Sequence, residues 1–184
     1  ITENRPDILL FTGDMVQLPD SNLDNVLKII KKVPKEIGVY AVSGNHESLN
    51  NNYKEIMDTL YSSGVHTLDG TDMYLKKGNS RIKIMGIMDP PTESDKITDD
   101  MIENIKELIN SFIENDPNCL NILAFHRASL YRELKDLKLD LILSGDTHGG
   151  VIRLPFIGGI IGDSLDGVLP EYTNGAFKEG NATM

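Results

Sequence analysis

The chain has 184 residues, of which 40% are hydrophobic and 25% are charged, a balance typical of one globular domain with a sizeable core. A formal net charge of -10 argues against a protein that binds nucleic acid through the phosphate backbone, because no stripe of Lys or Arg offsets the acidic residues. The single cysteine, Cys119, excludes an internal disulfide and a cysteine-based zinc cluster.

Short apolar runs alternate with segments of helical period through the first half of the chain, which indicates a layered α/β domain. Ser21 is a possible N-cap for the first helix, and Pro34 is expected to end it. Gly64 is expected to end the second helix. The predicted elements are strands over residues 8–11 and 39–42 and helices over residues 23–30 and 53–60.

The second half begins with an alternating stretch, residues 66–89, that predicts strands joined by a turn at Gly78 and Asn79. Part of the sheet is therefore expected to be antiparallel or mixed. Thr98 is the expected N-cap of an amphipathic helix that runs to residue 112. Two further buried strands are predicted over residues 121–125 and 139–143, with a helical segment over residues 130–137 between them.

Residues of metal-ligand type follow four of the predicted strands. Loops at the carboxyl ends of parallel strands converge on one crevice in open α/β sheets, so these side chains are expected to meet. A ligand set of carboxylate, amide and imidazole groups without a thiolate suits a divalent ion such as Mn, Fe or Zn. The candidates are Asp14 after the first strand, Asn45 and His46 after the second, His126 after the strand over 121–125, and Asp146 and His148 after the last.

Each metal-ligand candidate also has a purely structural explanation. Asp14 could be a turn or cap residue, and Asn45 could make an Asx turn. His126 alone would be more typical of a hydrogen-bonded core histidine, and Asp146 could cap a loop or pair with a cation. The convergence of four strand ends favours the metal site for all of them.

Two arginines and one further acid are weaker candidates. Arg127 and Arg153 could bind a substrate phosphate through two parallel N–H donors, although a solvated or ion-paired arginine is the commoner case. Asp89 ends an apolar strand pattern, so it is expected to lie in a turn or behind the ligands.

The motifs at the strand ends resemble those of the calcineurin-like metallophosphoesterase family. The matching residues are GD at 13–14, GNHE at 44–47, the lone His126 after a strand, and GDTH at 145–148. The longer run GDTHGGVIRLPFIGG at 145–159 is similar to a bacterial branch that includes membrane-associated phosphodiesterases acting on lipid-like substrates. The resemblance implies a single domain over 1–184 with the family's α/β (α+β) fold, a four-layer αββα sandwich of two mixed β-sheets flanked by helices.

The resemblance also implies a dinuclear metal centre and a role for each matching residue. Asp14 would bridge both ions. Asn45 and His126 would bind the second ion, and His148 would bind the first. His46 would be catalytic, donating to the phosphate or to the leaving-group oxygen. The implied reaction is hydrolysis of a phosphomonoester or phosphodiester by a metal-activated hydroxide.

The chain departs from the family pattern at its ends and at Asp146. The opening Asp-x-His motif, which supplies two ligands of the first ion, is absent, and family members continue past the last residue here into another core strand, so the domain is expected to be incomplete at both ends. Asp146 stands where the family has a histidine of its Gly-His-x-His motif, and a carboxylate there favours Mn or Mg. One ion keeps Asp14, Asn45, His126 and Asp146 while the other keeps only Asp14 and His148, so at most one well-held ion is expected.

Two functions of different class remain open. The first is a metal-dependent phosphoesterase, weakened in this chain, that hydrolyses a phosphoester through metal-activated hydroxide. The alternative is a non-catalytic module that keeps the fold and acts as a binding or scaffold domain. A buried polar cluster favours the enzyme, because a scaffold has no physical need for one.

The expected partner is a small-molecule or lipid-like phosphoester, and nucleic acid is not expected. Incomplete sheet edges could also pair between copies and form a homo-oligomer. No apolar stretch approaches the roughly 20 residues that span a bilayer, and no signal-type segment opens the chain. We therefore expect a cytoplasmic or peripherally membrane-associated location.

Overall fold

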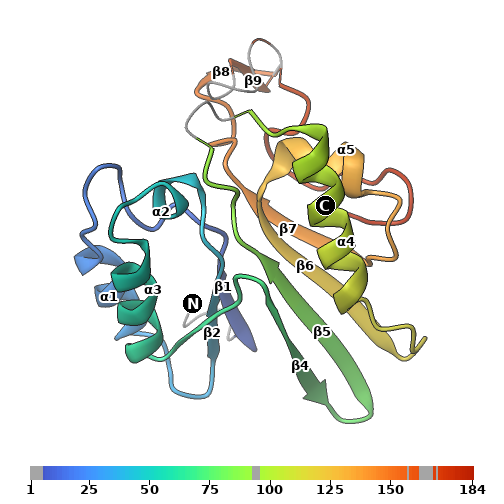
Figure 1. Cartoon of the computed structure of the whole chain (residues 1–184), viewed down its shortest axis with the longest axis horizontal. Coiled ribbons are helices and arrows are strands. Elements are labelled where there is room, and N and C mark those ends of the chain that lie inside the picture. Colours follow the sequence, from blue (N-terminus) through green and yellow to red (C-terminus); the bar gives the residue numbers. More distant parts are fainter. Residues whose placement is uncertain (1–5, 93–95, 157, 162–167, 169) are drawn as a thin grey trace.

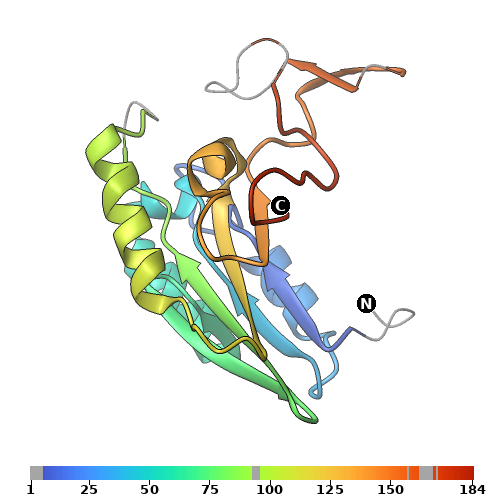
Figure 2. The same ribbon diagram turned by 90° about the vertical axis from the view of Figure 1, so that its right-hand side faces the viewer.

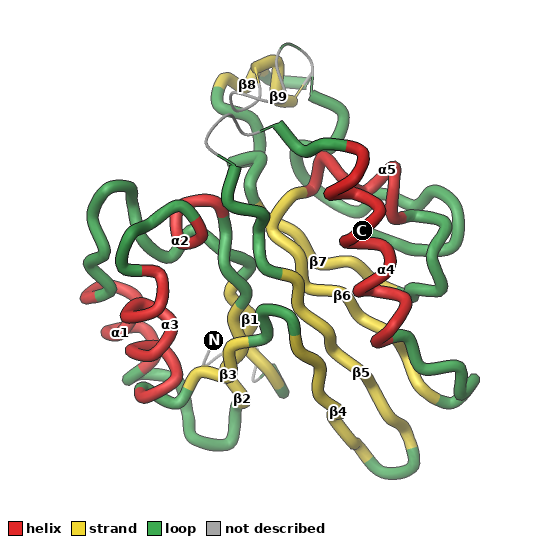
Figure 3. The backbone as a smooth tube through the Cα atoms, in the orientation of Figure 1, coloured by secondary structure: helices red, strands yellow, loops and turns green. Residues whose placement is uncertain are grey.

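The computed structural model describes residues 6–92, 96–156, 158–161, 168 and 170–184. Its strands lie in the middle and its helices on two outer sides, as Figure 3 shows. No helix among the described residues is long and apolar enough to cross a membrane.

The first sheet contains three parallel strands in the order β1 (Ile8–Phe11), β2 (Gly38–Ala41) and β3 (Val65–Thr67). Two helices, α1 (Asp24–Ile30) and α3 (Tyr53–Ser62), cover its outer face (Figure 1). β1 and β2 run parallel, so their carboxyl ends lie at one edge of the sheet.

The second sheet has four strands and is mixed. β4 and β5 are antiparallel, whereas β5, β6 and β7 run parallel to one another. The helix α4 and the short helix α5 cover its outer face. The bounds are β4 (Thr71–Lys77), β5 (Ser80–Ile87), α4 (Asp99–Phe112), β6 (Cys119–Arg127), α5 (Tyr131–Leu134) and β7 (Leu141–Gly145).

Three apolar clusters separate the layers. Successive side chains of a strand point to opposite faces, so β2 turns Val39 toward the helices of the first sheet and Tyr40 toward the second sheet. In β6, Ala124 likewise faces the first sheet while Leu123 faces α4 and α5. The four-layer αββα sandwich is therefore confirmed, with one correction: only the second sheet is mixed, because the first is parallel throughout its described strands.

Several predicted elements are present in the structure, most of them with ends that differ by one or two residues from the prediction. The strands over 8–11 and 39–42 correspond to β1 and β2, the helix over 53–60 to α3, and the strands over 121–125 and 139–143 to β6 and β7. The turn at Gly78 and Asn79 joins β4 to β5, with Lys77 paired to Ser80.

The two helix ends predicted at the start of α1 and after α5 were wrong. Ser21 does not cap α1, because the Asn22 side chain accepts the backbone N–H of Asp24 at 2.7 Å instead. The segment over 130–137 is helical only as a 3₁₀ turn at Ala128–Leu130 followed by α5. The helix ends there because the Lys135 carbonyl accepts the N–H groups of Asn181 and Ala182, at 2.8 and 3.0 Å, instead of an N–H group from a following helical turn.

Three further elements are short. The helix α2 (Asn45–Ser48) follows β2 directly, and near the end of the chain β8 (Ile152–Leu154) pairs with β9 (Gly158–Ile161). Figure 2 shows this two-stranded sheet standing beyond the main body. The last residues return to the second sheet, where the Ile142 N–H donates to the Thr183 carbonyl at 2.8 Å. Ile157, within the run that carries the family resemblance, lies outside the described residues.

Thr98 caps α4 as expected. Its hydroxyl accepts the Met101 backbone N–H at 3.3 Å, and Asp99 and Asp100 lie in the positive first turn of the helix. Thr98→Ala is expected to lower the free energy of unfolding by about 1 kcal/mol. Thr98→Ser, which keeps the acceptor, should stay within about 0.5 kcal/mol of the wild type in urea denaturation. Equal stability of the Ala variant would show that the cap contributes nothing.

Candidate metal centre

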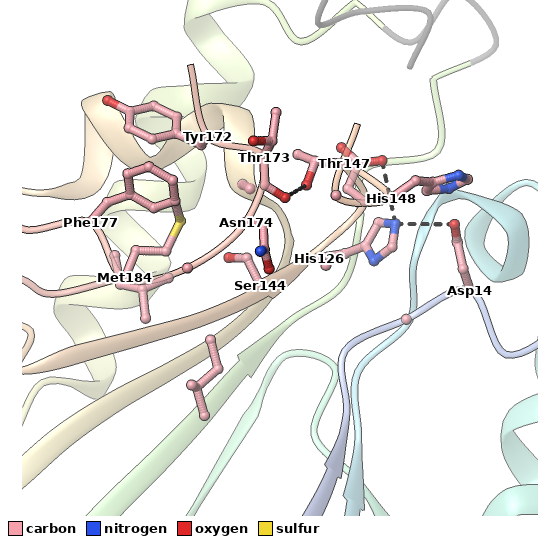
Figure 4. A pocket seen from close by; sticks show the side chains of 18 residues that line it. Asp14, His126, Ser144, Thr147, His148, Tyr172, Thr173, Asn174, Phe177 and Met184 are labelled. Carbon is pink, nitrogen blue, oxygen red and sulfur yellow. Dashed lines mark hydrogen bonds and ion pairs between the residues drawn. The ribbon is translucent and has the colours of Figure 1, made fainter. Parts of the chain in front are cut away.

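The end of β6 and the loops after β1 and β7 bring three of the predicted ligands together. The Nε2 atom of His126 lies 3.4 Å from Asp14 Oδ2 and 3.6 Å from Asp146 Oδ1. Figure 4 shows the His126 ring directed toward Asp14, with a dashed line between the two side chains. The three side chains belong to two different sheets, so the site lies at the seam between them.

His126 is held in one orientation. Its Nδ1 atom lies 2.6 Å from the Thr12 carbonyl oxygen, which accepts its proton and leaves Nε2 pointing at the carboxylates. Two buried polar atoms, His126 Nε2 and Asn45 Oδ1, have no hydrogen-bond partner among the described residues. Leaving such atoms buried costs free energy, so both are candidates to bind an ion.

The charges of this cluster support one another. Burial works against a charged His126, but Asp14, the Thr12 carbonyl and Asp146 outweigh it and raise the pKa of His126 to about 9. Burial also opposes the charge on Asp14, yet His126 and His46 together lower the pKa of its carboxyl. A proton on His126 therefore puts positive charge between the two carboxylates. A divalent cation bound to these side chains would supply positive charge at the same position.

The donor atoms fit a divalent ion in chemistry and in pairwise spacing. No three His, Cys, Asp or Glu side chains in the described part of the chain are grouped closely enough to hold a metal ion as they stand. The nearest approaches are the two between His126 and the carboxylates, at 3.4 and 3.6 Å. Two ligands of a tetrahedral ion with bonds of about 2.1 Å are about 3.4 Å apart, so these pairs need little adjustment.

Strained backbone is concentrated at the predicted ligands. Asp14, Asp146 and His148 have φ angles of 54°, 71° and 53°, in the left-handed region that side chains rarely adopt. Such conformations persist only where the surrounding structure enforces them, and they gather at functional sites.

Two glycines allow the loops after β1 and β2 to touch the site. A Cβ on Gly13 would collide with the His126 ring and with the Gly44 backbone, and a Cβ on Gly44 would collide with the Asp14 carboxyl group. Gly13 also has a φ of 100°. Close approach of the two backbones is thus what permits Asp14 and His126 to meet.

Glu47 holds these two loops together, a role that was not predicted. Its side chain is fully buried, and Oε2 accepts the N–H groups of Asp14 at 2.8 Å and Gly44 at 2.7 Å. Oε1 accepts the Val16 N–H at 2.8 Å. The spacing of Gly44 and Glu47, an N-cap followed three residues later by Glu, was a signal for part of this arrangement.

The two remaining predicted histidines lie at the margin of the cluster. His46 is half-buried in α2. Its backbone N–H donates to Asp14 Oδ1 at 3.2 Å, and its ring Nδ1 lies 3.2 Å from the Val16 carbonyl oxygen. His148 is exposed and lines the same pocket as Asp14, His126 and Asp146. The catalytic role of His46 and the metal-binding role of His148 stay predictions.

The two arginines have different surroundings, and the substrate-binding role proposed for Arg127 stays a prediction. Arg127 is buried against Asp89, to which its Nε donates at 3.0 and 2.9 Å and its Nη2 at 2.9 Å. Burial raises the pKa of Asp89 to about 6 despite this partner. Arg153 is exposed on β8 and donates to the Gly149 carbonyl, at the rim of the pocket, so it remains a candidate for a substrate phosphate.

A pocket of about 500 Å³ opens beside the cluster. One side of it is formed by the chain after residue 170, which was not predicted to contribute. Figure 4 shows Tyr172, Phe177 and Met184 at the end opposite to Asp14 and His148. No pattern within a short window of sequence could indicate this contact, because it joins segments about thirty residues apart.

Comparisons with known proteins agree with this geometry. A model of the family described as calcineurin-like phosphoesterase matches residues 1–150. The chain is 28% identical over 190 residues to the metallophosphoesterase YkuE of Bacillus subtilis (strain 168), covering 98% of this chain and 59% of that protein. It is 25% identical over 166 residues to the phosphodiesterase YaeI of Escherichia coli (strain K12), covering 85% of this chain and 54% of that protein. The chain thus spans little more than half the length of these curated relatives.

A solved structure resembles the fold. It is that of a Staphylococcus aureus protein assigned as a 5'-nucleotidase, in complex with alpha-ketoglutarate. The similarity has a TM-score of 0.51 at 14% identity, over 81% of this chain and 37% of that chain. At this level of identity the likeness concerns the fold alone.

Proposed function

The chain belongs to the calcineurin-like phosphoesterase family, and from this membership we propose that it carries the metal-dependent site of a phosphoesterase that hydrolyses a phosphomonoester or phosphodiester. The observation that supports this most is the approach of His126 Nε2 to Asp14 and Asp146. The buried Asn45 Oδ1, which has no hydrogen-bond partner among the described residues, is a further candidate ligand. A scaffold domain has no need for such a buried polar cluster, and nothing in the described site favours that alternative.

The proposed ligands of one divalent ion are Asp14, Asn45, His126 and Asp146. Carboxylate and amide oxygens prevail in this set, which favours a hard ion such as Mn over softer choices. His148 is the proposed ligand for a second, weaker position. When bound, the ion would supply positive charge for the phosphoryl oxygens and lower the pKa of water.

The chain's own residues have distinct proposed tasks around the phosphate. Thr12 and Glu47 orient His126 and the Asp14 loop through the hydrogen bonds described above. The Nδ1–H of His46 would donate to the Val16 carbonyl, and in the doubly protonated imidazolium form its Nε2–H would donate to the phosphate or to the leaving-group oxygen. Arg153, at the rim of the pocket, is proposed to donate a hydrogen bond to a phosphoryl oxygen.

The test is metal content after Mn²⁺ loading together with hydrolysis of bis(p-nitrophenyl) phosphate, for the wild type and for Asp146→His. We expect about one ion per chain and slow turnover in the wild type. Turnover should rise by about tenfold in Asp146→His, because an imidazole replaces a carboxylate whose negative charge offsets that of the ion.

Asp146→Ala is the matched control, because it removes the ligand without supplying another, and it should lose both ion and turnover. No ion and no turnover in the wild type and in Asp146→His would refute the proposed activity for this chain.

A further inference from the structure

The pocket beside the ligand cluster has two chemically different ends. Asp14, His126 and Asp146 form one end. At the other end Tyr172, Phe177 and Met184 present apolar surface, and Ser144, Thr173 and Asn174 lie between the two ends in Figure 4. The volume of about 500 Å³ is in the range of pockets that hold small organic ligands.

The apolar end is held in place by contacts within the fold. Tyr172 packs edge-on against Phe177 and against Tyr131, with ring centroids 5.1 and 5.2 Å apart. The Tyr131 hydroxyl in turn donates to the Ala182 carbonyl at 2.8 Å and accepts the Glu179 N–H at 2.7 Å. The wall is therefore preformed rather than assembled around a ligand.

The wall is also tied to the ligand cluster. The Thr147 hydroxyl, one residue after Asp146, donates to the Thr173 carbonyl at 3.1 Å. A phosphate at the cluster would thus have its organic group directed to a surface at a fixed position.

The charges of the lining residues disfavour anions away from the cluster. Asp14 and Asp146 are both acidic, and among the described residues that line the pocket none is a Lys or Arg. Arg153 lies at the rim, where it donates to the Gly149 carbonyl, and the two histidines of the lining, His126 and His148, lie at the end that holds Asp14. A second negative group on the ligand would meet apolar surface with no counter-charge, which costs free energy.

We propose that this pocket is a subsite for the uncharged, partly apolar organic group of a phosphoester, and that it rejects organic groups carrying a further phosphate or carboxylate. The proposal rests on the proposed function for the position of the phosphate. Phosphoesters of neutral aryl, acyl or sugar-like groups should therefore bind, whereas nucleoside di- and triphosphates should not.

The test uses two non-hydrolysable ligands that differ by one charge, phenylphosphonate and 4-carboxyphenylphosphonate. Isothermal titration calorimetry in the presence of Mn²⁺ should give a Kd at least about tenfold lower for phenylphosphonate. In Asn174→Lys, which places a cation on the exposed Asn174 in the lining, this ratio should fall to about one or reverse.

Two controls identify the cause of the change. Asn174→Gln alters the side chain without charge and should keep the wild-type ratio. Asn51→Lys adds the same charge at an exposed position outside the lining, and it should keep the ratio as well. A loss of discrimination in Asn51→Lys would attribute the effect to net charge and overturn the proposal.

Equal affinity for the two ligands in the wild type, or no binding of either, would overturn the subsite. Turnover of bis(p-nitrophenyl) phosphate, measured separately, reports on the proposed function. A tenfold preference without turnover would therefore support the subsite and refute the activity, whereas turnover without preference would do the reverse.

Discussion

His126→Asn is expected to lower the turnover of bis(p-nitrophenyl) phosphate by about a thousandfold or more. The amide of Asn can still donate to the Thr12 carbonyl, as His126 Nδ1 does, but it provides no atom in place of Nε2. The change thus removes the group that lies between Asp14 and Asp146 and leaves its support intact. Initial rates with saturating Mn²⁺ measure the effect.

His66→Asn is the matched control. His66 is exposed on β3, where its ring stacks on Tyr40 at 5.2 Å, and it lies outside the pocket beside the cluster. Its replacement should change turnover by less than about twofold, as expected for a surface position. If His126→Asn kept more than a tenth of the wild-type rate, the role assigned to His126 would be wrong.

Glu47→Gln is expected to lower the free energy of unfolding by about 3 kcal/mol, measured by urea denaturation. The buried carboxylate accepts three backbone N–H groups, those of Asp14, Val16 and Gly44. A Gln side chain has one oxygen, so its amide donors would face N–H groups that are themselves donors. Since two of these groups belong to the loops that form the site, Mn²⁺ affinity should also fall by about tenfold to a hundredfold.

Glu107→Gln, at an exposed position on α4, makes the same chemical change without burial and should cost less than about 0.5 kcal/mol. Glu47 would have no bridging role if its replacement cost as little as that of Glu107. Loss of stability with unchanged Mn²⁺ affinity would mean that Glu47 supports the fold but does not position the ligands.

Sequence patterns predicted the core of this site because the relevant signals are local. Each ligand candidate follows an apolar run, and parallel strands place such positions at one edge of a sheet. Asp14, His126 and Asp146 are therefore expected to meet, and His126 Nε2 lies 3.4 Å from Asp14 Oδ2 and 3.6 Å from Asp146 Oδ1. The strand ends also fixed the approximate place of Asn45 and His148.

Features that depend on contacts distant in sequence were missed. Glu47 bonds to residues 31 and 33 positions away, and Arg127 pairs with Asp89 across 38 positions. The end of α5 was missed for the same reason, because the Lys135 carbonyl accepts hydrogen bonds from residues near the end of the chain. Periodicity describes which face of an element is apolar, but it does not say which distant polar group will satisfy a buried one.

The most direct test of the account is a Mn²⁺ titration followed by electron paramagnetic resonance, because it detects the ion without requiring turnover. For the wild type we predict that the signal of free Mn²⁺ stays suppressed until about one ion per chain has been added. The suppression should disappear in His126→Asn and persist in His66→Asn. A wild-type chain that leaves all added Mn²⁺ free, or that binds it equally well without His126, would contradict the metal site at the carboxyl ends of β1, β6 and β7.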